Sequence, residues 1–312
     1  MVPQTRLRIA RWIAIPLVAV TYVLLVFGST VRIHDAGLAC PDWPMCFGQV
    51  IPVIDFGVAL EFGHRVLAGL ISLAFLGLAV VVFSARALRR EVGALVGISA
   101  VVLVVQIILG GLTVLELLDI WTVTSHLVTG NTFCALLLVL ALRLTEQGRD
   151  VQRPMLSWPE RLLPVGVLAL VFLQLGLGGL VASSHAGLAC GPVFPNCAGS
   201  GWFPTFEGPV GLQVVHRIGA FVVLAGALVS ALVLFRRSRI GVATLAVLGV
   251  VIAQATLGIV NVWTSMPAEI TAAHSAGAAL LVLTSTWASY EALRAPVFLA
   301  RSAPLAHSVE AR

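Results

Sequence analysis

Four of the seven histidines lie inside long apolar stretches of this chain: His64, His126, His216 and His274. Ionisable groups within a bilayer are costly and usually mark a functional site. Two imidazoles on facing helices, with apolar walls around them, suit the axial positions of a haem iron. A zinc site would use three or four protein ligands, and copper would favour a nearby thiolate or thioether. We therefore predict two bis-histidine haem sites and no other metal site. The alternative is that each histidine only hydrogen-bonds a neighbouring helix.

A single carboxylate distinguishes the two histidine-bearing motifs. The first reads EFGHRVLAG and places Glu61 three residues before His64, whereas the second reads QVVHRIGAF and places Gln213 before His216. Positions i and i+3 share a helix face, so Glu61 should project beside whatever His64 binds. A carboxylate there can act as an acid or a base, and an amide cannot. This predicts that the first half performs chemistry and the second holds a fixed cofactor. The alternative is an interfacial acid at a helix start, favoured by the helix dipole.

An arginine directly follows the first histidine of each pair, at Arg65 and Arg217. Because arginine pairs with carboxylates in a bidentate fork, both are candidates for contacts with haem propionates. The alternative is that they extend to the membrane interface. Small residues beside the histidines would let a flat macrocycle approach the backbone, or would simply allow close helix packing: Gly69, Gly110, Gly219 and Gly258.

A cysteine-bearing segment precedes each motif. His34–Cys46 reads HDAGLACPDWPMC, and His185–Cys197 reads HAGLACGPVFPNC. At this point a metal site, a redox pair and a structural disulfide all remain open for these cysteines.

The elements that carry these residues are membrane-spanning helices. Of the 312 residues, 59% are hydrophobic and only 11% are charged, whereas soluble domains have about 25% charged residues. A transmembrane helix needs roughly 20 mainly apolar residues. The chain contains eight such segments, which predict an all-α polytopic membrane protein, at about 12–30, 62–85, 93–115, 123–143, 162–182, 210–235, 240–262 and 269–293.

The basic residues orient these segments. All 19 are arginines, and 16 of them fall before the first segment, after every second segment, or at the C-terminal end. By the positive-inside rule that side is cytoplasmic, so both termini are expected inside and both cysteine loops outside. Since the arginines lie in short loops between apolar segments, the net charge of +5 does not indicate a nucleic-acid partner.

The chain also repeats itself. The cysteine loops, the His64 and His216 motifs, and the segments QIILGGLTV and QATLGIVNV recur at a spacing of about 150 residues. We therefore predict two pseudo-symmetric four-helix bundles, residues 1–150 with the reactive site and residues 151–312 with the cofactor site. An even number of helices in each half makes the repeats parallel.

This ordered combination resembles the haem A synthase family. The resemblance covers nearly the whole chain: eight helices in tandem halves, Glu-x-x-His on the second helix, histidines on helices two, four, six and eight, and paired cysteines in two outer loops. The cysteine pairs match the branch found in Gram-positive-type bacteria. At the ligand positions the sequence does not depart from the family pattern.

The resemblance implies a haem O oxidase of the bacterial plasma membrane. Haem O would bind between His64 and His126, and its C8 methyl would become a formyl group through successive hydroxylations, with water as the oxygen source. Glu61 matches the essential acid of the family, and His216 and His274 would ligate haem b. Haem O synthase (protohaem farnesyltransferase) would supply the substrate, and an unidentified quinone or redox protein would accept electrons.

For the cysteines, the resemblance and the expected location outside the membrane both favour intra-loop disulfides, Cys40–Cys46 and Cys190–Cys197. One zinc site sharing all four thiolates is the alternative.

Two other functions remain open from the sequence alone. A dihaem b-type cytochrome linked to quinone would explain the four histidines, but neither the Glu61/Gln213 difference nor the repeated cysteine loops. A transporter built from repeats would be expected to have broken helices and charges at the midplane.

Overall fold

A computed structural model describes residues 4–197, 199 and 201–297 of the chain. Apart from one short 3-10 helix (η1, Ala186–Leu188), its regular structure consists of eight α-helices, as predicted. Their bounds are α1 (Gln4–Ile33), α2 (Phe56–Ser84), α3 (Arg86–Leu115), α4 (Ile120–Glu146), α5 (Trp158–Ser183), α6 (Gly208–Leu234), α7 (Ser238–Trp263) and α8 (Ala268–Arg294).

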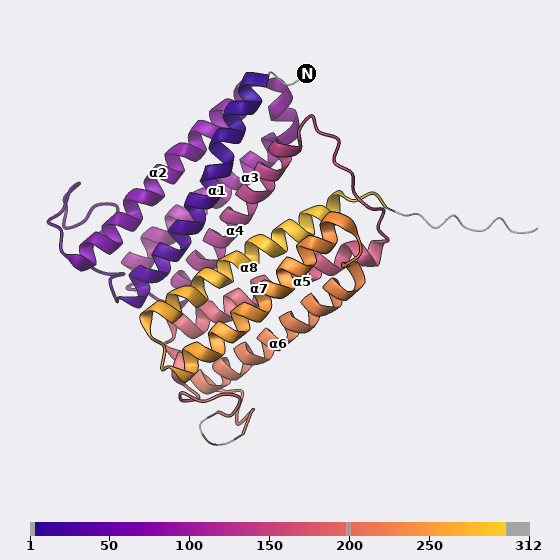
Figure 1. Cartoon of the computed structure of the whole chain (residues 1–312). Helices are drawn as coiled ribbons and strands as arrows, with labels where there is room; N and C mark the ends of the chain where they lie inside the picture. The colour runs from indigo at the N-terminus through magenta and orange to yellow at the C-terminus, as the bar shows by residue number, and fades with distance from the viewer. Residues whose placement is uncertain (1–3, 198, 200, 298–312) are drawn as a thin grey trace, which may run out of the picture.

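The helices form two bundles of four, α1–α4 and α5–α8, that lie side by side (Figure 1). The bundles meet where α4 packs against α5 and where α1 and α4 pack against α8. Both cysteine loops lie at one end of the molecule, and the start of α1 and the connection between α4 and α5 lie at the other (Figure 1). The predicted boundary at residue 150 falls in that connection.

Seven of the eight helices are long and apolar enough to cross a membrane, α8 being the exception. The reason is its position. Helix α8 packs against α1, α4, α5 and α7, so much of its surface faces protein rather than lipid. Its buried face carries polar side chains, among them Thr271, Ser285, Ser289 and Glu291. A central helix can accommodate such residues because its neighbours supply hydrogen-bond partners.

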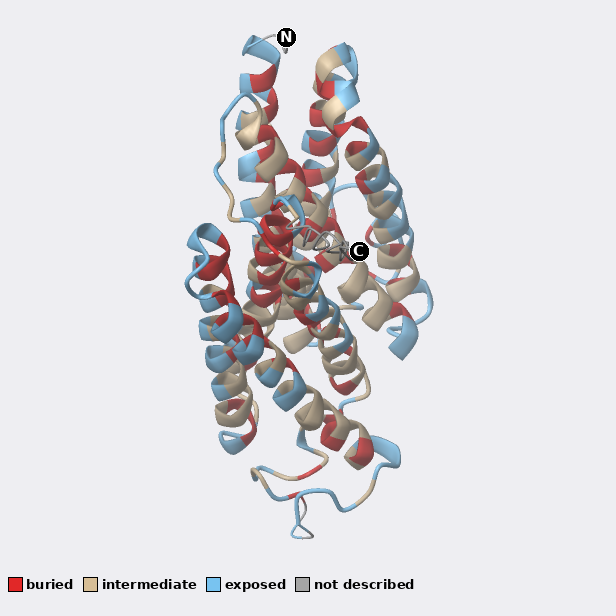
Figure 2. Cartoon of the chain, turned by 90° about the vertical axis from the view of Figure 1, so that its right-hand side faces the viewer, coloured by how far each residue is buried: buried red, intermediate tan, exposed pale blue. Residues whose placement is uncertain are grey.

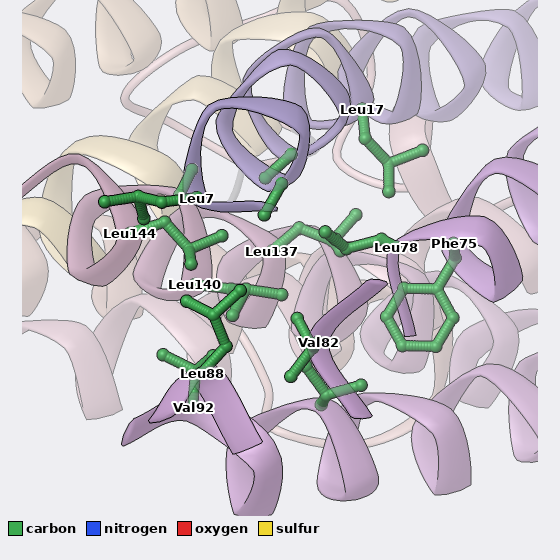
Figure 3. Close-up of a cluster of buried hydrophobic side chains, with 14 of the residues drawn as sticks. Leu7, Leu17, Phe75, Leu78, Val82, Leu88, Val92, Leu137, Leu140 and Leu144 are labelled. Carbon is green, nitrogen blue, oxygen red and sulfur yellow. The ribbon is translucent and has the colours of Figure 1, made fainter. Parts of the chain in front are cut away.

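The other helices place large apolar side chains outward. On α2, Leu70, Leu73, Leu76 and Val80 are all exposed, which is the pattern expected for a surface that faces lipid tails. Buried residues line the inward faces of the helices, as Figure 2 shows. In the first bundle, leucine, valine and phenylalanine side chains from all four helices point toward one another (Figure 3).

In both bundles, an arginine caps the last turn of the fourth helix at the end opposite the cysteine loops. Arg11 Nε donates to the Leu144 carbonyl of α4 (2.8 Å), and Arg161 Nε donates to the Ala292 carbonyl of α8 (3.1 Å). Carbonyls in the last turn of a helix lack partners within the helix, so each arginine caps the fourth helix of its own bundle. The two arginines, 150 residues apart in the sequence, therefore make the same kind of contact in the two bundles.

Candidate active site

The four histidines predicted as ligands lie on α2, α4, α6 and α8, near the end that carries the cysteine loops. Each is about two turns past the first residue of its helix, or about 9–12 Å along the axis at 1.5 Å per residue. The structure brings them together as two pairs. His126 lies close enough to His64 to act on it electrostatically, and His274 is related to His216 in the same way.

Each histidine ring rests on a glycine of the preceding helix. A methyl group added at Gly28 would lie 2.9 Å from Cε1 of His64, and one at Gly110 would lie 3.0 Å from Cε1 of His126. In the second bundle, the corresponding distances are 3.1 Å for Gly178 and His216, and 3.0 Å for Gly258 and His274. No larger residue fits at these four positions without displacing a histidine ring.

The chemistry of these pairs fits haem iron. The Nδ1 atoms of His64, His126 and His274 are buried without a hydrogen-bond partner, and an unpaired polar atom in an apolar interior is costly unless a ligand compensates it. Within the described residues, histidine, cysteine, aspartate and glutamate nowhere gather in groups of three or more suited to a metal ion. The two imidazoles of each bundle would therefore be suitable ligands for a haem iron.

Glu61 lies within α2 rather than at its start. The N-cap of α2 is Asp55, whose Oδ1 accepts a hydrogen bond from the Val58 N–H (2.8 Å). Glu61 follows more than one turn later and is only 4% exposed. Its Oε2 accepts a hydrogen bond from the Cys40 backbone N–H (2.7 Å), and its Oε1 forms an ion pair with Arg65. The carboxylate therefore links the cysteine loop to the helix that bears His64.

In the second bundle, the corresponding side chain holds its loop by donating a hydrogen bond rather than accepting one. Gln213 is equally buried, but its Nε2 donates to the Gly187 carbonyl (3.0 Å). Its Oε1 is buried without a partner. Both side chains thus hold their loop, but only Glu61 brings a carboxylate to the site.

Arg65 and Arg217 are both engaged by loop backbone. Arg65 donates to the carbonyls of Asp42 (2.8 Å), Met45 (2.6 Å) and Cys40 (3.3 Å). Arg217 donates in the same manner to the carbonyls of Pro195 (3.2 Å), Asn196 (3.0 Å) and Val193 (3.0 Å). Each guanidinium therefore ties a cysteine loop to its helix, and contact with a haem propionate remains a prediction.

Both predicted disulfides are present. Cys40 and Cys46 are bonded with their Cα atoms 4.7 Å apart, and Cys190 and Cys197 with theirs 4.3 Å apart. The zinc alternative is therefore not realised in this structure.

The two disulfide loops close differently. The Trp43 ring packs on Gly111, next to the glycine that supports His126; a methyl group at Gly111 would lie 3.1 Å from it. In the second loop, Phe194 packs instead against Phe221, with ring centroids 6.5 Å apart. Through Trp43, the first loop thus reaches across from α2 to α3.

Sequence reasoning missed one set of residues at the site. Three glutamines contact the histidines from α3, α5 and α7: Gln106, Gln174 and Gln254. The signal was a repeated Q-x-x-x-G spacing that ends on Gly110, Gly178 and Gly258. Of the small residues expected to face a macrocycle, Gly219 lies against Gln174 instead, and a methyl group added at Gly69 would point into open space.

The fold and the site together define a multi-pass helical membrane protein with one bis-histidine pair in each of two related bundles. The chain belongs to the cytochrome oxidase assembly protein family, COX15-CtaA, which it matches over residues 10–59 and 55–286.

Curated relatives agree with this assignment. The heme A synthase of Shewanella oneidensis is 30% identical, with 86% of this chain and 92% of that protein covered. The heme A synthase of Geobacillus thermodenitrificans is 29% identical, with 86% of each chain covered. That of Maricaulis maris is 26% identical, covering 92% of this chain and 96% of the relative.

Proposed function

We propose that this chain is a haem A synthase, which oxidises the C8 methyl group of haem O to a formyl group for aa3-type cytochrome oxidase. One observation carries the proposal. A buried carboxylate, Glu61, lies one helical turn from His64 in the first bundle, while the second bundle has the neutral Gln213 at the same place. The curated relatives named heme A synthase support the same activity.

The chemistry requires a group that moves protons. Oxidising a methyl group to an aldehyde with one water as oxygen source releases four protons and four electrons, through an alcohol and then a hydrated aldehyde that loses water. Glu61 is the titratable side chain at the first site that can accept such protons. Its hydrogen bond from the Cys40 N–H and its ion pair with Arg65 hold the carboxylate in place.

The remaining residues of the first bundle bind and enclose the substrate. His64 and His126 would hold the iron of haem O from its two faces, while Gly28 and Gly110 hold the imidazole rings in position. Trp43 covers the helix beside His126, and so helps to exclude water. Haem b, bound by His216 and His274, would supply electron transfer to an acceptor, which we expect to be a quinone or a redox protein.

The cellular setting follows from charge and substrate chemistry. The positive-inside distribution of arginines supports an orientation with both termini in the bacterial cytoplasm and both disulfide loops on the outer face of the plasma membrane. Because haem O is very apolar, we expect its donor to be the membrane enzyme haem O synthase.

Expression in a bacterial host that makes haem O but no haem A tests the proposed function. We expect haem A to accumulate, with its formyl group identified by pyridine haemochrome spectra and mass spectrometry. A purified protein that binds haem without forming haem A would support a dihaem b-type electron-transfer cytochrome instead. A colourless protein would contradict both haem functions and would favour the transporter interpretation.

Thiol labelling of intact cells tests the orientation and the disulfides together. We expect a membrane-impermeant maleimide to label the four loop cysteines only after treatment with an impermeant reductant. Cys134, which is free and buried in α4, should react only after denaturation. Ser238→Cys, at the opposite end of the molecule, serves as the control and should label only in permeabilised cells. Labelling of the loop cysteines only after permeabilisation would reverse the proposed topology.

A further inference from the structure

Three of the four histidine ligands are restrained by a glutamine, and one is not. A glutamine lies one helical turn before three of the glycines that support the histidines. These glycines are Gly110, Gly178 and Gly258, which support His126, His216 and His274. At the fourth position, on α1, Gly28 supports His64 in the same way, but the residue one turn earlier is Leu24. The four-fold repeat of the site is therefore broken at a single side chain.

Each glutamine touches its histidine directly. Gln106 Nε2 lies 3.3 Å from Nε2 of His126, Gln174 Nε2 lies 3.1 Å from Nδ1 of His216, and Gln254 Nε2 lies 3.4 Å from Nε2 of His274. Gln174 and Gln254 also donate to the backbone carbonyl of their histidine, at 2.9 Å in both cases. Each imidazole is thus held by an amide on the adjoining helix.

Each of the three glutamines has a side-chain oxygen that is free to accept a hydrogen bond. The Oε1 atoms of all three are buried without a partner, and so are the Nδ1 atoms of His126 and His274. When iron occupies one ring nitrogen, the other carries a proton and needs an acceptor. Turning the side-chain amide over would present its oxygen to the ring nitrogen that Nε2 now approaches, and such a bond fixes the ring orientation and strengthens the ligand.

On α1, the His64 ring meets apolar neighbours in place of a glutamine. Phe27 meets its ring edge-on, with centroids 6.0 Å apart, and Gly28 lies beneath it. Its Nδ1 is buried, and within the described residues the His64 side chain has no hydrogen-bond partner. Leu24 is partly buried and packs on the hydrophobic core of the first bundle, so it can neither accept nor donate. In addition, α2 packs on α3 less extensively than α6 packs on α7.

We propose that Gln106, Gln174 and Gln254 are positioning residues for the histidine ligands, and that Leu24 leaves His64 as the ligand that releases the iron when haem is exchanged. This inference rests on the proposed function, in which the first bundle takes up haem O and releases haem A while the second retains haem b. A site that must turn over needs one ligand that detaches easily, whereas a permanent site does not. The pattern of glutamines follows this difference.

Haem transfer to apomyoglobin tests the role of Leu24. The purified protein, carrying haem O and haem b, is mixed with excess apomyoglobin, and the loss of each haem is followed optically. Because a hydrogen bond to the outer nitrogen of a ligand typically changes affinity by about 10- to 100-fold, we expect Leu24→Gln to slow haem O release about tenfold. Haem b release should not change. Leu24→Met, of similar size but without the hydrogen bond, should release haem O like the wild type.

Electron paramagnetic resonance separates positioning from mere packing. A new hydrogen bond to His64 should shift the low-spin signal of haem O in Leu24→Gln and leave that of haem b unchanged. Conversely, Gln254→Leu should speed haem b release about tenfold and shift only the haem b signal. Should Leu24→Gln fail to fold, Gln106→Leu gives an independent test, with faster haem O release expected.

Equal haem O release from Leu24→Gln and Leu24→Met, in proteins with intact haem b spectra, would overturn the inference. So would an unchanged haem b signal in Gln254→Leu. Haem A formation by the wild-type chain distinguishes this failure from failure of the proposed function. If haem A forms and release rates do not respond, only the role assigned to Leu24 and the glutamines is wrong.

Discussion

Replacing Glu61 by glutamine is expected to lower haem A formation at least about 100-fold while haem b remains bound. The size of the effect follows from general acid–base catalysis, which contributes about 10²- to 10⁴-fold. The substitution keeps the shape of the side chain and an oxygen that can still accept from the Cys40 N–H. It removes the negative charge beside Arg65 and the capacity to take up a proton, so the first site acquires the amide that the second already has at Gln213.

The measurement is the ratio of haem A to haem O extracted from membranes, together with the optical spectrum of haem b in the purified variant. Glu91→Gln is a suitable control, because Glu91 pairs with Arg143 at the end opposite the cysteine loops and its loss should change haem A formation less than twofold. Near-normal haem A formation by Glu61→Gln would contradict a catalytic role. Loss of every bound haem would show instead that Glu61 is needed to hold the loop and the bundle together.

The features that could be predicted from the sequence are those that occur in both halves of the chain. His64 and His216 lie on the second helix of each bundle, and the disulfide loops precede them at nearly the same spacing. A bilayer also restricts the possibilities, because a long apolar segment can only become a spanning helix. Helix number and both disulfides could therefore be predicted without knowledge of packing.

The features that the sequence did not predict depend on contacts between distant segments. Helix α1 begins at Gln4 rather than near residue 12, and within this added part Arg11 donates to the Leu144 carbonyl of α4, 133 residues away in the chain. Likewise, Arg65 and Arg217 are of a residue type that commonly binds carboxylates. In the structure their guanidinium groups donate to backbone carbonyls of the loops. Residue type indicates what a guanidinium can bind, but only the folded loop decides which acceptors lie nearest.

The glutamines illustrate a third case, in which the pattern was present but its meaning was not. Gln106 and Gln254 are the first residues of the repeated segments QIILGGLTV and QATLGIVNV. A glutamine in an apolar helix is most simply interpreted as a packing residue that bonds a neighbour. Its significance emerges only when His126 and His274 are seen to lie against it from the adjoining helix.

Removing one histidine from each pair is expected to empty the two sites independently. His274→Ala should reduce bound haem b at least about tenfold, since a haem held by two side chains loses one of its two iron ligands. His64→Ala should retain haem b and lose the capacity to convert haem O. The reason for this independence is the fold, because the two pairs lie in separate four-helix bundles that meet mainly through α1, α4, α5 and α8.

Haem content per protein, measured by pyridine haemochrome analysis and extraction, distinguishes the sites. His34→Ala is the matched control, because His34 lies in the first outer loop and its ring contacts Phe56, with centroids 5.5 Å apart, rather than another histidine. It should retain haem b and haem A formation. If His64→Ala loses haem b while His274→Ala retains it, the two bundles have been assigned in reverse. If either change empties both sites, the bundles bind haem cooperatively. The assignment of separate substrate and cofactor sites, which rests on Glu61 and Gln213, would then be wrong.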